Sequence, residues 1–290
     1  MQLSSVTGSM ADRQPLLRVD NISKTFGSSM AWWRKDAGNR ALDDISFEVY
    51  GKEIVGIVGE SGCGKSTLAR IVVGLERADA GHISLRGRSI VGPKAGEDVA
   101  AKLRGIQMVF QDPYGSLNPR MRVGDVIGEG LRIRGDASRT EIDAKVAQML
   151  ELVGLRATDA DRHPHQFSGG QRQRIGIARA LVMAPDLLIA DEAVSALDVS
   201  VQMQILNLLL DVRDTLGIAI IFITHNIAVV EYLCDRAIVI SGGKVVEQGP
   251  ALEVVTAPAH PYTQRLISAV PTINNAATSG GRRPLTRVNA

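Results

Sequence analysis

Residues 53–67 read EIVGIVGESGCGKST, and this stretch predicts the core of the fold. A continuous apolar run leads into a glycine-rich loop, and residues 59–66 fit the pattern G-x-x-x-x-G-K-[ST] in full. A loop of this pattern between a buried strand and a helix cradles phosphate groups, because its backbone N–H groups and the helix dipole both favour an anion. We therefore expect a strand, a phosphate-binding loop and a helix in succession.

The residues of this loop have expected roles in nucleotide binding. Lys65 would bridge the β and γ oxygens of a triphosphate, and the Ser66 hydroxyl would ligate Mg²⁺. Cys63 is expected to be a small tolerated residue rather than a redox switch. The expected nucleotide contacts in the loop are Gly59, Ser61, Gly62, Cys63, Gly64, Lys65, Ser66 and Thr67.

Two other apolar runs have the character of strands that are buried on both faces of a parallel sheet. They read DLLIAD at residues 186–191 and AIIFITH at residues 219–225. Helical patterns separate the strands, which is typical of an α/β fold. The expected helices cover residues 66–73, 171–183 and 201–216.

Two regions depart from this alternation. Residues 16–26, 41–50 and 83–90 are short, partly alternating and β-prone, and they predict an antiparallel layer near the N-terminus. Between residues 112 and 170, a turn-rich segment precedes a stretch with helical spacing of its apolar residues, which predicts an inserted helical subdomain.

Composition and charge argue against several classes of protein. The net charge of the 290-residue chain is +2, with no clustered basic face, so no nucleic-acid partner is expected. The longest apolar stretch, residues 216–223, falls far short of the roughly 20 residues that cross a bilayer. The N-terminus lacks the features of a secretory signal, and Cys63 and Cys234 lie too far apart for metal-ligand spacing. We expect a cytoplasmic protein with a peripheral role, if any, at a membrane.

Acidic and polar side chains follow the predicted buried strands. Asp191 and Glu192 end one strand, where it opens onto the same crevice as the phosphate loop. Asp191 would hold Mg²⁺ through its water shell, and Glu192 would act as general base toward the attacking water. His225 ends another strand near the expected γ-phosphate, although a lone histidine is usually structural. The Gln111 amide, between core and helical subdomain, would reach Mg²⁺ or water.

Residues 167–171, FSGGQ, predict a second anion-binding helix start. Ser168 has the chemistry of an N-cap, and the two glycines that follow permit close backbone approach to a phosphate. One nucleotide cannot easily use both this site and the loop at 59–67.

In this order, the motifs resemble those of the ATP-binding subunit of an ABC transporter. Residues 59–67 match the Walker A loop, residues 167–171 the signature and residues 187–192 Walker B. Single positions match the Q-loop glutamine, the adenine-stacking aromatic, the D-loop aspartate and the switch histidine, respectively Gln111, Phe26, Asp198 and His225.

The resemblance implies an ATP hydrolase that binds MgATP. ATP would lie between the Walker A loop of one protomer and the signature of another, contacted there by Ser168, Gly169, Gly170 and Gln171, with Asp198 nearby. Metal contacts would come from Ser66, Gln111 and Asp191. The partners would be two transmembrane permease subunits, a second copy or a paralogous ATPase, and indirectly an extracytoplasmic solute-binding protein. The subunit would sit on the cytoplasmic face of the membrane.

A narrower resemblance points to the oligopeptide/dipeptide importer branch. It rests on residues 110–121, 163–181 and especially 260–271, HPYTQRLISAVP. Two departures, Phe167 for the commoner leucine and Ala193 for the commoner proline, are expected to have little effect. Some relatives carry an iron–sulfur cluster near the C-terminus, but this chain has no cysteine after Cys234, so no Fe–S cluster is expected.

The resemblance predicts an ATPase domain over residues 16–257 and an importer-type extension over 258–273. Residues 274–290 are small and polar, and we expect them and residues 1–15 to be disordered. In the loop at 27–40, Trp32 and Trp33 would pack locally, with a contact to a partner or membrane surface as the alternative. The segment between Gln111 and Ser168 is too short for the coiled coil of repair and chromosome ATPases, and translation-linked members carry two cassettes. An ATPase subunit of a soluble complex of the phosphonate-breakdown type remains an alternative, and the transported solute stays open.

Overall fold

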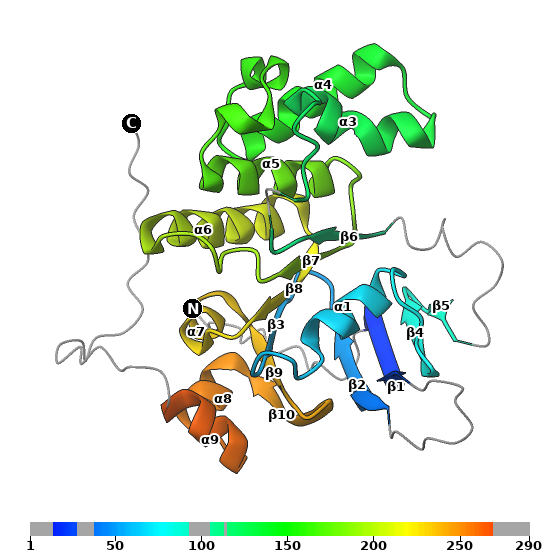
Figure 1. The fold of residues 1–290 in the computed structure, drawn as a ribbon, viewed down its shortest axis with the longest axis vertical. Helices are drawn as coiled ribbons and strands as arrows, with labels where there is room; N and C mark the ends of the chain where they lie inside the picture. The colour runs from blue at the N-terminus through cyan, green and yellow to red at the C-terminus, as the bar shows by residue number, and fades with distance from the viewer. Residues whose placement is uncertain (1–13, 28–37, 93–104, 113–114, 269–290) are drawn as a thin grey trace, which may run out of the picture.

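A six-stranded sheet lies at the centre of the molecule (Figure 1). The structure, a computed structural model, describes residues 14–27, 38–92, 105–112 and 115–268. In spatial order the strands are β10 (Lys244–Pro250), β9 (Arg236–Ser241), β3 (Ile54–Val58), β8 (Ala219–Thr224), β7 (Leu187–Asp191) and β6 (Ile106–Val109). All neighbours pair in parallel except β10 and β9. The apolar runs read as parallel strands are thus confirmed as β3, β7 and β8.

Strand β8 explains why these strands are apolar throughout. Ile220 and Phe222 pack into the core beneath the helices, whereas Ile221 and Ile223 pack into the core shared with a second sheet. Successive side chains of a strand point to opposite faces, so a strand that is covered on both sides needs apolar residues at every position.

The second sheet is antiparallel, as predicted. Its order is β2 (Asn39–Val49), β1 (Leu17–Phe26), β4 (Ala80–Leu85) and β5 (Arg88–Val91). Residues 83–90 form the end of β4, a turn and the start of β5 rather than one strand, because Arg86 and Gly87 both have positive φ, as a tight two-residue turn requires. Helix α1 (Lys65–Val72) packs between the two sheets (Figure 1).

Helices cover the other face of the central sheet. Helices α5 (Gly169–Leu181) and α6 (Val199–Leu216) lie nearest the strands, and α3 (Val123–Arg134) and α4 (Arg139–Leu152) pack on α5 (Figure 1). Two 3-10 turns, Ala157–Asp161 and Pro164–Gln166, lead into α5. The expected mixed α/β fold with an inserted helical layer is confirmed, whereas the exact domain boundaries stay a prediction.

Three short helices complete the described chain: α7 (Ile227–Leu233), α8 (Ala251–Thr256) and α9 (Pro261–Ser268). They share a small apolar cluster with the end of β3. None of the helices in the described part of the chain has the length and hydropathy that crossing a bilayer needs. Trp32, Trp33 and the terminal segments predicted to be disordered lie outside the described residues, except for 14–15.

The start of α4 offers a test of how the helical layer is stabilised. The Ser138 hydroxyl accepts a hydrogen bond from the Glu141 N–H, and the Glu141 carboxylate accepts one from the Ser138 N–H. Ser138→Ala should therefore lower the free energy of unfolding by about 1 kcal/mol, measured by urea denaturation followed by circular dichroism. Arg139→Ala, at the exposed neighbouring position, is the control, and equal midpoints for the two variants would contradict the capping assignment.

Candidate nucleotide site

The phosphate loop fits tightly between neighbouring strands. A Cβ atom at Gly59 would come within 2.2 Å of the Ile240 carbonyl oxygen, and one at Gly64 within 2.4 Å of the Ala41 carbonyl oxygen. Gly64 also has a φ of 108°, in the left-handed region that favours glycine. The glycines of the motif are therefore required by close packing of the loop as well as by space for a ligand.

Lys65 is folded back onto the loop. Its side chain is 5% exposed, and its Nζ donates to the carbonyl oxygens of Gly59 at 2.7 Å and Glu60 at 2.8 Å. Neither carbonyl carries a formal charge, so these two bonds do not neutralise the ammonium group. Its positive charge lies inside the loop, where a phosphate group would be attracted.

Ser66 and Asp191 meet at the edge of the central sheet where β3 and β7 end. The Ser66 hydroxyl donates to the Asp191 carboxylate at 3.1 Å, although the two residues come from α1 and the end of β7. Burial raises the pKa of Asp191, and the hydrogen bond from Ser66 partly offsets that effect. A hydroxyl and a partly desolvated carboxylate are oxygen donors of the kind that Mg²⁺ prefers, so this pair fits the expected metal.

Glu192 is the centre of a second polar cluster. The Gln111 amide donates to one of its carboxylate oxygens at 2.9 Å, and His225 Nδ1 lies 3.4 Å from the other. The backbone of Glu192 has a φ of 47°, an uncommon conformation for a residue other than glycine. Backbone bonds to Ile223 and Ser195 hold it there. The carboxylate is thereby fixed between two polar side chains from separate elements.

A cavity of about 390 Å³ opens beside both clusters. The side chain of Phe26 forms part of its wall, with Lys24 Nζ 5.2 Å from the ring centroid. Asn39 and Ala41, at the start of β2, also line it, and sequence reasoning missed both because no motif marks them. The predicted residues that line the cavity are Phe26, Ser61, Gly62, Gly64, Lys65, Ser66, Thr67, Gln111 and Glu192.

The signature residues are absent from this lining and form a separate group. The Ser168 hydroxyl accepts from the Gln171 N–H at 3.3 Å, which caps α5 as expected. A Cβ at Gly170 would come within 2.3 Å of Val201 in α6. Asp198 caps α6 by accepting from the Val201 N–H at 3.0 Å, and this bond lowers the pKa of Asp198. The signature and the D-loop thus lie together, outside the cavity of their own chain.

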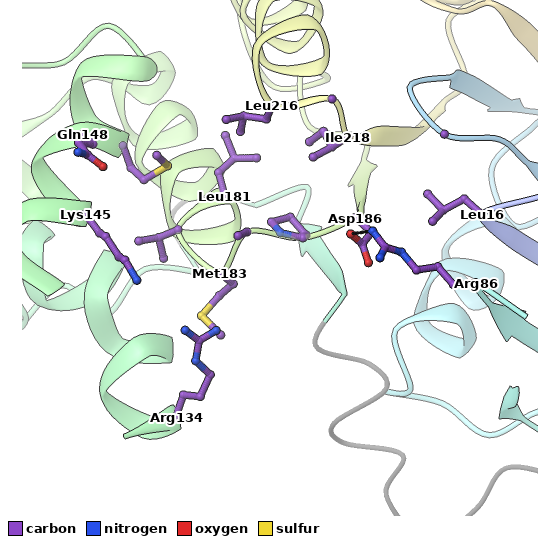
Figure 2. A pocket seen from close by; sticks show the side chains of 16 residues that line it. Leu16, Arg86, Arg134, Lys145, Gln148, Leu181, Met183, Asp186, Leu216 and Ile218 are labelled. Carbon is purple, nitrogen blue, oxygen red and sulfur yellow. Dashed lines mark hydrogen bonds and ion pairs between the residues drawn. The ribbon is translucent and has the colours of Figure 1, made fainter. Parts of the chain in front are cut away.

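A second cavity, of about 520 Å³, lies between the helical layer and the sheets (Figure 2). Arg134, Lys145 and Gln148 line one side, and an ion pair between Arg86 and Asp186 lies on the other. This cavity shares no described residue with the cavity beside the phosphate loop. It is therefore not part of the nucleotide site.

Comparison with known proteins agrees with this geometry. The profile of the ABC transporter family matches residues 42–195, and that of the oligopeptide/dipeptide transporter C-terminal region matches residues 246–289. The chain is 48% identical over 233 residues to the oligopeptide transport ATP-binding protein OppF of Bacillus subtilis, covering 80% of this chain and 76% of that protein. It is 42% identical over 269 residues to the dipeptide transport ATP-binding protein DppF of Haemophilus influenzae, covering 93% and 82%.

Solved structures include a related fold. The structure of cbiO1 from Clostridium perfringens, part of the ABC transporter complex cbiONQ, superimposes with a TM-score of 0.71 at 31% identity and covers 83% of this chain and 90% of that chain. The matched family profile spans the phosphate loop, the signature and the Asp191–Glu192 pair. On its sequence, its fold and the arrangement of its site, the chain belongs to the ABC transporter family, as an ATPase subunit.

Proposed function

We propose that this chain binds and hydrolyses MgATP to energise the uptake of oligopeptides, dipeptides or a related solute through separate transmembrane subunits. The observation that carries the ATPase assignment is the cavity that joins the phosphate loop to Glu192 while leaving the signature outside. The solute class is supported by the match of residues 246–289 to the C-terminal region of oligopeptide/dipeptide transporters and by the names of the relatives.

The chemistry follows from the two polar clusters. Lys65 would exchange its bonds to the Gly59 and Glu60 carbonyls for bonds to phosphate oxygens. Glu192 would orient the attacking water and accept its proton as the bond between the γ-phosphorus and the ADP oxygen breaks. His225 and Gln111 would keep the Glu192 carboxylate aimed at that water.

The metal would be held by residues that already lie together. Ser66 would bind Mg²⁺ directly, Asp191 would bind it through water, and the Gln111 side chain would complete the set. When bound, the ion would neutralise part of the negative charge on the phosphates. Since Asp191 is partly desolvated, a nearby cation would also favour its ionised form.

Two protomers would share each ATP. The helix start at Ser168 presents backbone N–H groups that suit a phosphate, but it lines no part of the cavity beside the loop of its own chain. In a head-to-tail dimer, the signature of one protomer would face the phosphate loop of the other, and ATP would join them. The second protomer would be another copy of this chain or a paralogous ATPase.

A groove beside β6 suits the permease. Its volume is about 550 Å³, and its wall contains the exposed apolar side chains Leu75, Phe110 and Ile133. Exposed apolar side chains gathered in one groove are typical of an interaction site. A cytoplasmic helix of a permease subunit would fit in this groove, next to Gln111. That contact would hold this chain peripherally on the membrane.

Replacing the general base should separate binding from turnover. Glu192→Gln is expected to reduce phosphate release by the assembled transporter more than about 100-fold, because the amide cannot accept the proton. With MgATP and its partner subunit, the variant should elute as a dimer in size-exclusion chromatography. Glu151→Gln, an exposed change in α4, should leave both measurements at wild-type values; a Glu192→Gln protein that stays monomeric would refute the shared site.

A charge at the signature should act only in the assembled complex. Ser168→Asp keeps an N-cap acceptor but places a negative charge toward the triphosphate of the other protomer, so hydrolysis should fall roughly 100-fold. MgATP binding by the isolated subunit, measured by calorimetry, should stay within about twofold of wild type. Ser138→Asp makes the same change at the cap of α4 and should alter neither quantity. Loss of binding in the isolated Ser168→Asp subunit would contradict the assignment.

The groove can be tested without touching the site. Ile133 is 81% exposed, so Ile133→Glu should leave folding and MgATP binding intact while reducing co-purification with the permease at least about tenfold. Leu252→Glu, at an exposed position in α8, serves as the control and should co-purify normally. Equal recovery of permease with both variants would exclude this groove as the docking surface.

A further inference from the structure

Helix α9 reaches the phosphate loop from the C-terminal end of the chain. Its Tyr262 side chain is buried, and the Tyr262 hydroxyl accepts a hydrogen bond from the Glu60 backbone N–H at 3.0 Å. Glu60 is the second residue of the phosphate loop, so the loop is bonded to an element 202 positions away in sequence.

The peptide group between Gly59 and Glu60 links this tyrosine to Lys65. Its N–H donates to Tyr262, and its C=O accepts from Lys65 Nζ at 2.7 Å. The orientation of one planar peptide unit is therefore fixed by Tyr262 at one end and Lys65 at the other. If the hydroxyl were removed, the N–H would lose its partner and the peptide would be freer to rotate.

Helix α9 is itself held firmly. The Glu247 carboxylate of β10 accepts from the backbone N–H groups of Ala259 and His260, at 2.8 and 3.0 Å. Tyr262 packs in one apolar cluster with Val58, which ends the strand before the loop, and Ile227, which begins α7 just after His225. The tyrosine thus packs with the end of the strand that leads into the loop and with the start of the helix that follows the histidine.

We propose that Tyr262 is a positioning residue for the phosphate loop, through which the C-terminal extension sets the affinity of this subunit for ATP. By holding the Gly59–Glu60 peptide, Tyr262 keeps the loop amides in the arrangement that receives the phosphates, even after Lys65 has released the Gly59 carbonyl. Burial raises the pKa of Tyr262, so its hydroxyl stays protonated at neutral pH. The inference rests on the proposed function, since it concerns the binding of ATP to this loop.

Tyr262→Phe tests the inference in the full-length chain, because it removes the hydroxyl and keeps the ring in the apolar cluster. Loss of one hydrogen bond should raise the dissociation constant for MgATP, and the KM for ATP of the assembled transporter, by about 3- to 10-fold. The kcat at saturating ATP should change less than about twofold, because the groups around Glu192 are untouched. A purely structural role would lower the melting temperature without this separation of KM from kcat.

Tyr232→Phe is the matched control. Tyr232 is a half-exposed tyrosine in α7 whose hydroxyl bonds to Asn207, away from the loop, so its loss should leave the KM unchanged. Glu247→Gln gives a second, independent variant that loosens the start of α9 and should raise the KM in the same direction. In the double variant with Tyr262→Phe, the rise should be smaller than the product of the two single effects, because both act through one bond.

Two results would overturn the inference while leaving the proposed function intact. One is a Tyr262→Phe protein whose KM equals that of wild type, and the other is a rise in KM that Tyr232→Phe reproduces. Failure of the wild-type chain to bind MgATP at all would instead refute the proposed function, so the two failures are distinguishable.

Discussion

The parallel pairing of β3, β8 and β7 is the constraint on which the site depends. Ile54 to Val58 lie opposite Ile220 to Thr224, and Ala190 lies opposite Phe222. In this register the three strands end together, and the residues that follow each strand meet at one edge of the sheet. Backbone pairing alone therefore places the phosphate loop, the two acids and the histidine at the same edge of the sheet. This placement does not depend on contacts among their side chains.

That arrangement has an electrostatic cost that neighbouring residues offset only in part. Asp191 and Glu192 are adjacent carboxylates at a buried strand end, and both burial and the charge of Glu192 raise the pKa of Asp191. The hydroxyl of Ser66 and the positive charges of Lys65 and Arg70 act in the opposite direction. In the proposed function, a bound cation would act in the same direction as these positive charges, because it would favour the ionised form of Asp191.

Local patterns made much of this predictable. The loop at 59–67, the acids after β7 and the cap at Ser168 all follow from a few neighbouring residues whose chemistry is visible in the sequence. The places of Asn39, Ala41 and Tyr262 beside the loop could not be predicted in this way. Each comes from a distant segment that carries no phosphate-binding pattern, and only the folding of the chain brings it to the loop. The hairpin at Arg86 and Gly87 was missed for a different reason: Arg86 adopts a left-handed conformation that its residue type does not favour.

The contact between Gly170 and Val201 has a mechanical meaning. With so little space between the first turns of α5 and α6, neither can slide past the other without backbone overlap or a change in side-chain packing. The two helix starts are therefore packed against each other, with Ser168 as the N-cap of α5 and Asp198 as the N-cap of α6. A displacement of either N-cap would therefore be passed to the other helix start and, through α5, to the helices α3 and α4 that pack on it.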